Sequence, residues 1–133
     1  MRIRPPLVLV FSMVAACASG GSTTAPRGSR DLILLAEIES VQVTNAFELI
    51  QRLRPEMLRP RSGGGFSSIP TPVVYLDGVR HGEIDSLNSV PRDIVREVQY
   101  ISGPDATTRF GTGHTGGAIL IATRRGNGNG PPA

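Results

Sequence analysis

Three stretches of the sequence decide the fold: VVYLDGV (73–79), VPRDIVREVQYISGPDATTRFGTG (90–113) and GGAILIATRRG (116–126). The first opens on a β-branched and aromatic run, Val73–Leu76, which is typical of a strand. Asp77-Gly78 follows, and this dipeptide readily adopts the positive φ angles of a tight hairpin turn. We therefore expect a strand, a turn and a short second strand at Val79-Arg80.

The second stretch predicts a helix and then a strand. Pro91 suits the first turn of a helix over Leu87–Val95, and Asp93 would lie near its positive end. The strand is expected at Glu97–Ser102, where apolar residues alternate. The residues expected in the core are Val90, Ile94, Val95, Val98 and Tyr100.

Gly103-Pro104 opens another short helix, Asp105–Phe110, for which Gly111 is the expected stop. Ala118–Thr123 (AILIAT) is apolar throughout and predicts a strand covered on both faces. The order of elements indicates an α+β fold with a small mixed sheet and short helices.

Residues 32–55, which precede these stretches, are expected to form mostly helix. Leu32–Leu35 is compatible with a first strand or with the start of a helical turn at Glu37–Ser40. Thr44 or Asn45 can cap a helix, with Glu48 in a capping-box position. This helix would bury Phe47, Leu49, Ile50 and Leu53 and end at Pro55.

The amino terminus has the order of a secretory signal. Arg2 and Arg4 precede an apolar run, Leu7–Ala16, and small residues follow it. The run is about half of the roughly 20 residues that a membrane-spanning helix needs. We therefore expect residues 1–16 to be a signal peptide.

The tetrad Val14-Ala15-Ala16-Cys17 resembles the lipobox of bacterial lipoproteins, in which diacylglycerol is attached to the cysteine and the new amino terminus is acylated. The resemblance implies lipidation at Cys17, with palmitate as a typical acyl group. The alternative is an ordinary signal with an incidental cysteine, but Cys17 is the only cysteine, so no disulfide explains it. In that family an aspartate directly after the lipidated cysteine retains the protein in the inner membrane. This chain has Ala18 at that position, so the resemblance favours the outer membrane, on its periplasmic face.

The composition excludes several classes of function. The net charge is +3, and without Arg2 and Arg4 it is +1, which gives little field to attract nucleic acid. Every basic residue is arginine, so a Schiff-base or P-loop lysine is excluded. Residues 17–30 and 126–133 are poor in apolar groups and are expected to be a flexible tether and a disordered tail around one domain at 31–125.

Several residues suggest chemistry that their context does not support. Gly111–Gly116 matches the dinucleotide pattern G-x-G-x-x-G, but it precedes a strand instead of opening a helix, so we expect a turn. His81 and His114 are expected to be exposed loop histidines, even with Glu83 and Asp85 near His81. The Asp77, Glu83, Asp85 group matches no EF-hand loop.

The arginines Arg52, Arg54, Arg59 and Arg61 are expected on a solvated face, with an anionic partner as the alternative. We predict no catalytic, cofactor or metal site, and no enzyme.

The three stretches, in their order, resemble the plug domain of TonB-dependent outer-membrane receptors. In that family an Asp-Gly-Val hairpin leads to a proline-started helix with an Asp-Ile pair, a Gly-Pro helix ending in glycine and an Ile-x-Ile-x-Thr-Arg strand. The helix from Thr44 to Pro55 also resembles the early plug helix. A receptor plug is followed by a barrel of about 22 strands, whereas ten residues follow Thr123, so we expect no transport pore here.

The resemblance implies a non-enzymatic interaction module linked to outer-membrane transport. Its expected partners are the membrane, through the lipid, and an outer-membrane barrel or a TonB-system protein. The alternative is a lipoprotein that binds a nutrient or siderophore through the loops Ser62–Thr71 and His81–Asp85.

Overall fold

The computed structural model of the chain describes residues 28–59 and 70–126. The strands are β1 (Leu32–Ile33), β2 (Val73–Leu76), β3 (Val79–Gly82), β4 (Val95–Ile101) and β5 (Ala118–Thr123). The helices are α1 (Leu35–Glu39), α2 (Ala46–Leu53) and α3 (Gly103–Phe110). Three 3-10 helices accompany them: η1 (Pro55–Met57), η2 (Ile84–Ser89) and η3 (Arg92–Ile94).

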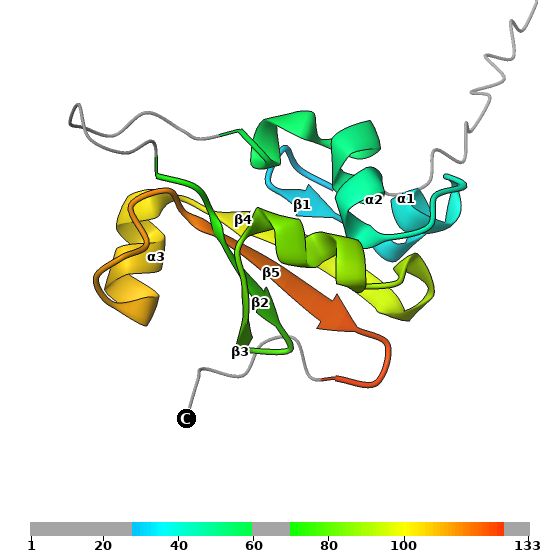
Figure 1. Cartoon of the computed structure of the whole chain (residues 1–133). Coiled ribbons are helices and arrows are strands. Elements are labelled where there is room, and N and C mark those ends of the chain that lie inside the picture. Colours follow the sequence, from blue (N-terminus) through cyan, green and yellow to red (C-terminus); the bar gives the residue numbers. More distant parts are fainter. Residues whose placement is uncertain (1–27, 60–69, 127–133) are drawn as a thin grey trace, which may run out of the picture.

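The described strands form one sheet in the order β1-β4-β5-β2-β3 (Figure 1). β5 pairs antiparallel with β4 and parallel with β2, and β3 forms an outer edge beyond β2. The sheet is therefore mixed, which confirms the expected α+β class with short helices. The central place of β5 follows from its apolar sequence, since a strand buried on both faces has no polar side to present to water.

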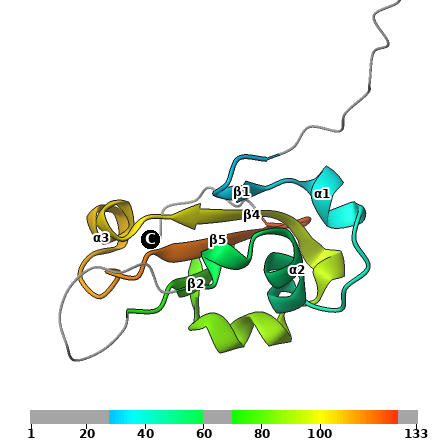
Figure 2. The ribbon, with the colours of Figure 1, turned by 90° about the horizontal axis from the view of Figure 1, so that it is seen from above.

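Apolar side chains pack on both faces of the sheet. On one face Ile119 and Ile121 join a core with α2 and η2, including Leu49, Ile50 and Leu87. On the other face Ala118 and Leu120 pack with residues of α3 and β2. All six residues of β5 are buried, which confirms the prediction for this strand. In Figures 1 and 2, α3 lies at one end of the sheet, away from α1 and α2.

Helix α2 begins and ends as its sequence predicts. The backbone N–H of Glu48 donates to Asn45 Oδ1 at 2.9 Å, and the Thr44 N–H donates to Glu48 Oε2 at 2.9 Å. These bonds satisfy donors that have no partner within the helix. Leu53 is the last helical residue, two before Pro55.

The predicted helix over Leu87–Val95 is wrong. Two 3-10 helices, η2 and η3, stand on either side of Val90 and Pro91, whose backbones are extended. The proline ring disfavours the helical conformation of the residue before it, so η2 cannot continue through Val90. Ile94 is consequently not a core residue and is 41% exposed. It is the last residue of η3, a three-residue 3-10 helix with no buried residue, and Val95, at which β4 begins, is buried. Val90, Val95, Val98 and Tyr100 are buried as expected.

The hairpin turn is confirmed, with φ of 49° at Asp77 and 85° at Gly78. Its second strand, β3, extends to Gly82, two residues beyond the expected end. The run Leu32–Leu35 divides between both expected structures, because β1 occupies its first two residues and α1 begins at Leu35. α1 therefore starts two residues before the helical turn expected at Glu37.

Candidate interaction surface

Two large apolar side chains are exposed among the described residues, and both lie at the same end of the sheet. Val79 is 70% exposed and Ile94 is 41% exposed. Val79 follows the β2–β3 turn, and Ile94 precedes β4, beside the residue at which β5 ends. The ends of β5 and β2 lie between them, and this end of the sheet is a candidate for binding because it carries the large exposed apolar side chains of the described residues.

Asp77 fixes the hairpin turn to the end of β5. Its carboxylate accepts a hydrogen bond from Thr123 N at 2.8 Å and another from Thr123 Oγ1 at 2.7 Å. The Asp77 N–H donates to the Ile121 carbonyl at 2.9 Å. This carboxylate is therefore engaged in the fold, and the turn that carries Val79 is tied to the central strand.

A pocket of about 470 Å³ adjoins Ile94. It is lined by Asp93, Ile94, Thr123, Arg124 and Arg125. The Arg124 N–H donates to the Ile94 carbonyl at 2.8 Å, which joins the two walls. We call Asp77–Val79, Asp93–Ile94 and Thr123–Arg125 together the sheet-end surface. In Figure 1 the β2–β3 turn and the end of β5 lie low in the view, whereas α1 and α2 lie high.

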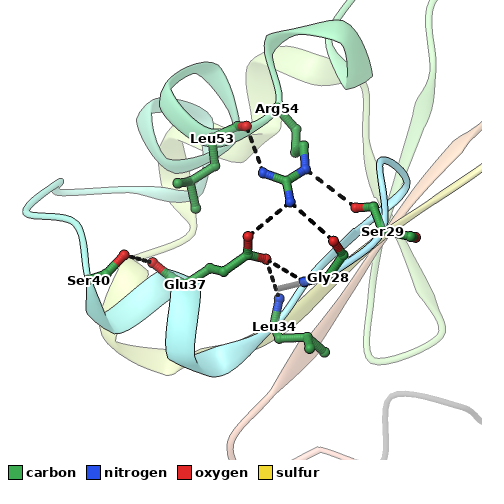
Figure 3. Close-up of polar contacts among 7 residues, drawn as sticks. All are labelled: Gly28, Ser29, Leu34, Glu37, Ser40, Leu53 and Arg54. Atoms are coloured by element: carbon green, nitrogen blue, oxygen red, sulfur yellow. Dashed lines mark hydrogen bonds and ion pairs between the residues drawn. The ribbon is translucent and has the colours of Figure 1, made fainter. Parts of the chain in front are cut away.

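On the side of α1 and α2, a partly buried ion pair holds the residues where the described chain begins (Figure 3). Glu37 Oε1 and Arg54 Nη2 are 2.9 Å apart, and their side chains are 13% and 17% exposed. Glu37 Oε2 also accepts hydrogen bonds from the Gly28 and Leu34 N–H groups at 3.1 and 3.4 Å. Arg54 donates to the carbonyls of Gly28 and Ser29 at 3.5 and 3.4 Å. The pair therefore connects α1 and α2 with residues 28 and 29.

The surroundings of Glu37 change its acidity. Burial opposes ionisation of the carboxyl, but the hydrogen bonds from Arg54, Gly28 and Leu34 and the charge of Arg54 outweigh it. The pKa of Glu37 is therefore below its ordinary value of 4.5.

The arginine cluster predicted around α2 is only partly a solvated face. Arg52 and Arg59 are exposed, as expected. Arg54 is not, because its guanidinium is enclosed by the Glu37 interaction. Arg61 lies outside the described residues.

The glycines at the start of α3 and in the segment after it have two structural roles, close packing of the backbone and positive φ angles. A Cβ at Gly103 would lie 2.2 Å from the Thr115 carbonyl oxygen, and one at Gly116 would lie 2.5 Å from that of Thr71. Gly111 and Gly113 have positive φ angles of 90° and 96° with open space around them. The segment lies between α3 and β5, which agrees with the expected turn.

His114 is not an exposed loop histidine, which corrects the prediction. It is 7% exposed and lies beside the stacked rings of Tyr75 and Phe110. Its Nδ1 is 2.9 Å from the Gly111 carbonyl, so Nδ1 carries the proton that this bond needs. In the neutral ring Nε2 is then the acceptor for the Tyr75 hydroxyl, 2.8 Å away. The turn at Gly111 and Gly113 brings the ring back over β2, and the sequence pattern gave no indication of that return.

His81 is exposed, as predicted, but it lies in β3 and not in a loop, and its Nε2 is 3.0 Å from Ser89 Oγ. It is not brought together with Glu83, Asp85 and other potential ligands, because residues 28–59 and 70–126 contain no group of three or more histidine, cysteine or acidic side chains suited to a metal. The same residues include no helix with the length and apolar character to cross a bilayer. Cys17 and most of the loop Ser62–Thr71 lie outside the described residues.

Comparisons with known proteins returned no matching family model, no matching curated protein and no matching solved structure.

Proposed function

We propose that the protein is a non-enzymatic lipoprotein that is anchored through Cys17 at the periplasmic face of the outer membrane. Its plug-like domain binds a protein partner through the sheet-end surface. The partner class is an outer-membrane barrel or a component of the TonB system.

The observation that carries the proposal is the gathering of Val79, Ile94 and a pocket at one end of the sheet. Apolar side chains on a charged background are the usual anchors of a protein interface, because their burial on binding is favourable. The hydrogen bonds between Asp77 and Thr123 fix the β2–β3 turn to the end of β5. The surface is therefore preorganised, and binding costs little conformational entropy.

The attachment of the chain leaves this surface available. Residues 28 and 29 are hydrogen-bonded to Arg54 and Glu37 (Figure 3), and neither of these two side chains belongs to the sheet-end surface. Eleven chain steps separate Cys17 from Gly28, and they span at most about 40 Å when extended. A lipid at Cys17 would thus keep Gly28, and with it the domain, within that distance of the membrane.

The plug-like likeness supports the partner class. The Asp-Gly-Val motif forms the β2–β3 turn, the Gly-Pro motif opens α3 and the Ile-x-Ile-x-Thr motif forms β5. These motifs build one mixed sheet. A plug in that family lies inside a barrel, so a barrel is the natural candidate partner for a domain of this kind.

Site-specific photo-crosslinking in native membranes tests the proposal. A benzophenone amino acid at Val79 should give a discrete adduct, and mass spectrometry of that adduct should identify a barrel or a TonB-system protein. The matched control is the same amino acid at Thr108, which is exposed on α3 at the other end of the sheet. Adducts of equal yield from both positions, or none from Val79, would refute the sheet-end surface as the binding surface.

A further inference from the structure

The residues that line the pocket beside Ile94 are partly apolar and carry an excess of positive charge. Its lining residues include two arginines, Arg124 and Arg125, and one acidic residue, Asp93. The exposed Ile94 side chain supplies apolar surface beside them. A ligand that complements this lining is an anion attached to an apolar group.

The two arginines are not equivalent. Arg124 Nη2 is 3.1 Å from Glu39 Oε1, so its charge is balanced by α1. Arg125 has no salt-bridge partner among residues 28–59 and 70–126. Its guanidinium retains all five donors, and its fork matches the two oxygens of a carboxylate.

Asp93 makes a peptide a better ligand than a free organic acid. Its carboxylate is 87% exposed and lies 3.7 Å from Arg92, so it keeps lone pairs that can accept a hydrogen bond. An alkyl acid has a carboxylate and an apolar group but no N–H that could donate to Asp93. The last residue of a polypeptide offers a carboxylate for Arg125, an N–H for Asp93 and a side chain for Ile94.

The volume of the pocket suits one terminal residue of a peptide and the residues next to it. The volume of about 470 Å³ lies in the lower part of the range of ligand pockets, about 300–1,000 Å³. It exceeds the volume of one apolar side chain and is too small for a folded segment.

We propose that this pocket binds the free carboxyl terminus of a polypeptide that ends in an apolar residue. The inference rests on the proposed function, because it gives the chemistry by which the partner is recognised at the same surface. Arg125 binds the terminal carboxylate and Ile94 contacts the terminal side chain.

Fluorescence anisotropy with the purified full chain tests the inference. The probe is a fluorescein-labelled Gly-Ser-Ala-Leu peptide with a free carboxylate, compared with the same peptide as its terminal amide. We expect the amide to bind at least about tenfold more weakly, because it cannot form the charge-assisted pair with Arg125. Arg125→Gln should lower the affinity for the free acid by a similar factor and leave the affinity for the amide unchanged.

Arg59→Gln is the matched control, since Arg59 is an exposed arginine outside the pocket, and it should bind as the unchanged protein does. Ile94→Ser should weaken binding of both peptides. Equal binding of acid and amide, or an Arg125→Gln protein with unchanged affinity, would overturn the inference. Competition by 4-methylpentanoate as strong as that by the peptide would overturn it too, because the ligand would then be a small acid.

The two proposals fail differently. A Val79 adduct with a barrel protein together with no binding of the free-acid peptide would leave the interaction surface standing and remove the terminal carboxylate as its ligand. Loss of the adduct together with retained peptide binding would support the carboxylate site and remove the barrel partner.

Discussion

At the residue scale, Glu37 joins parts of the chain that are distant in sequence. One carboxylate oxygen faces Arg54 on the end of α2, and the other accepts the N–H groups of Gly28 and Leu34. A group with this many partners contributes most when all of them are present, since removal of one leaves buried polar atoms unsatisfied.

Replacement of Glu37 by Gln should lower the free energy of unfolding by about 1–2 kcal/mol, because Arg54 loses a partly buried, hydrogen-bonded counter-charge. Urea denaturation measures the change. Glu39→Gln is the matched control: the Glu39–Arg124 pair is 54% and 46% exposed, and exposed pairs contribute about 0–1 kcal/mol. Equal losses of unfolding free energy for the two variants would show that the Glu37–Arg54 pair stabilises the fold no more than an exposed ion pair does.

The acidity of Glu37 gives a pH dependence of defined sign. Its pKa in the folded protein is below 4.5, so the unfolded chain binds this proton more tightly. The stabilisation is fully present above pH 4.5 and is lost as the pH falls through the folded pKa. Thermal unfolding should show a Tm difference between the unchanged protein and Glu37→Gln that is constant near neutral pH and shrinks in acid. A difference that grows in acid would contradict this assignment.

Tyr75 and His114 give a second residue-scale prediction. Tyr75→Phe keeps the ring stacked on Phe110 but leaves His114 Nε2 without its partner. The loss of stability should be about 1–2 kcal/mol, the usual cost of an unsatisfied buried acceptor. Chemical denaturation measures it, and an unchanged midpoint would show that water already satisfies this nitrogen.

At the element scale, the glycines at the start of α3 and between α3 and β5 serve two purposes. Gly103 and Gly116 lie where two backbones meet, and Gly111 and Gly113 adopt positive φ angles in open space. The glycines of the dinucleotide-like pattern Gly111–Gly116 are therefore explained by turn geometry at two positions and by close packing at Gly116.

Gly103→Ala should destabilise the domain more than Gly113→Ala. The first places a methyl group 2.2 Å from the Thr115 carbonyl oxygen, and such overpacking costs about 1–3 kcal/mol or more. The second meets open space at a φ of 96°, for which the penalty is about 1–2 kcal/mol. Differential scanning fluorimetry ranks the two, and the reverse order would refute this account of the glycines.

The elements that the sequence predicts well are those with a local physical cause. Asn45 caps α2, Asp77-Gly78 makes the hairpin turn and the unbroken apolar run makes β5. The break at Pro91 also has a local cause, since a proline keeps the preceding Val90 extended. What the sequence does not reveal is the pairing of this stretch with the start of α2, where the Ala46 N–H donates to the Val90 carbonyl and the Arg92 N–H donates to the Thr44 carbonyl.

The candidate site was predictable only in part for the same reason. Asp77 stands out in the sequence as a turn residue, but its bonds to Thr123 need the parallel pairing of β2 with β5, 46 residues apart. His114 is buried because the turn after α3 returns over Tyr75. The Glu37–Arg54 pair could have been suspected only from opposite charges on two short helices, a signal shared by many exposed pairs.

At the scale of the whole molecule, two features define how the protein would work. Arg54 and Glu37 hold the start of the described chain beside α1 and α2, and the sheet-end surface presents Val79 and Ile94 elsewhere on the domain. In the proposed function the lipid at Cys17 keeps the domain at the membrane and the surface selects the partner.

Fractionation of cells that produce the unchanged protein or Cys17→Ser tests the central claim most directly. The account predicts that the unchanged protein is recovered with the outer membrane, with its first residue, Cys17, carrying the mass of a diacylglycerol and an added acyl chain. The Cys17→Ser protein should be recovered without these lipids in the soluble fraction or as an uncleaved, mislocalised precursor. Undiminished retention of Cys17→Ser in the outer membrane would contradict the lipid anchor.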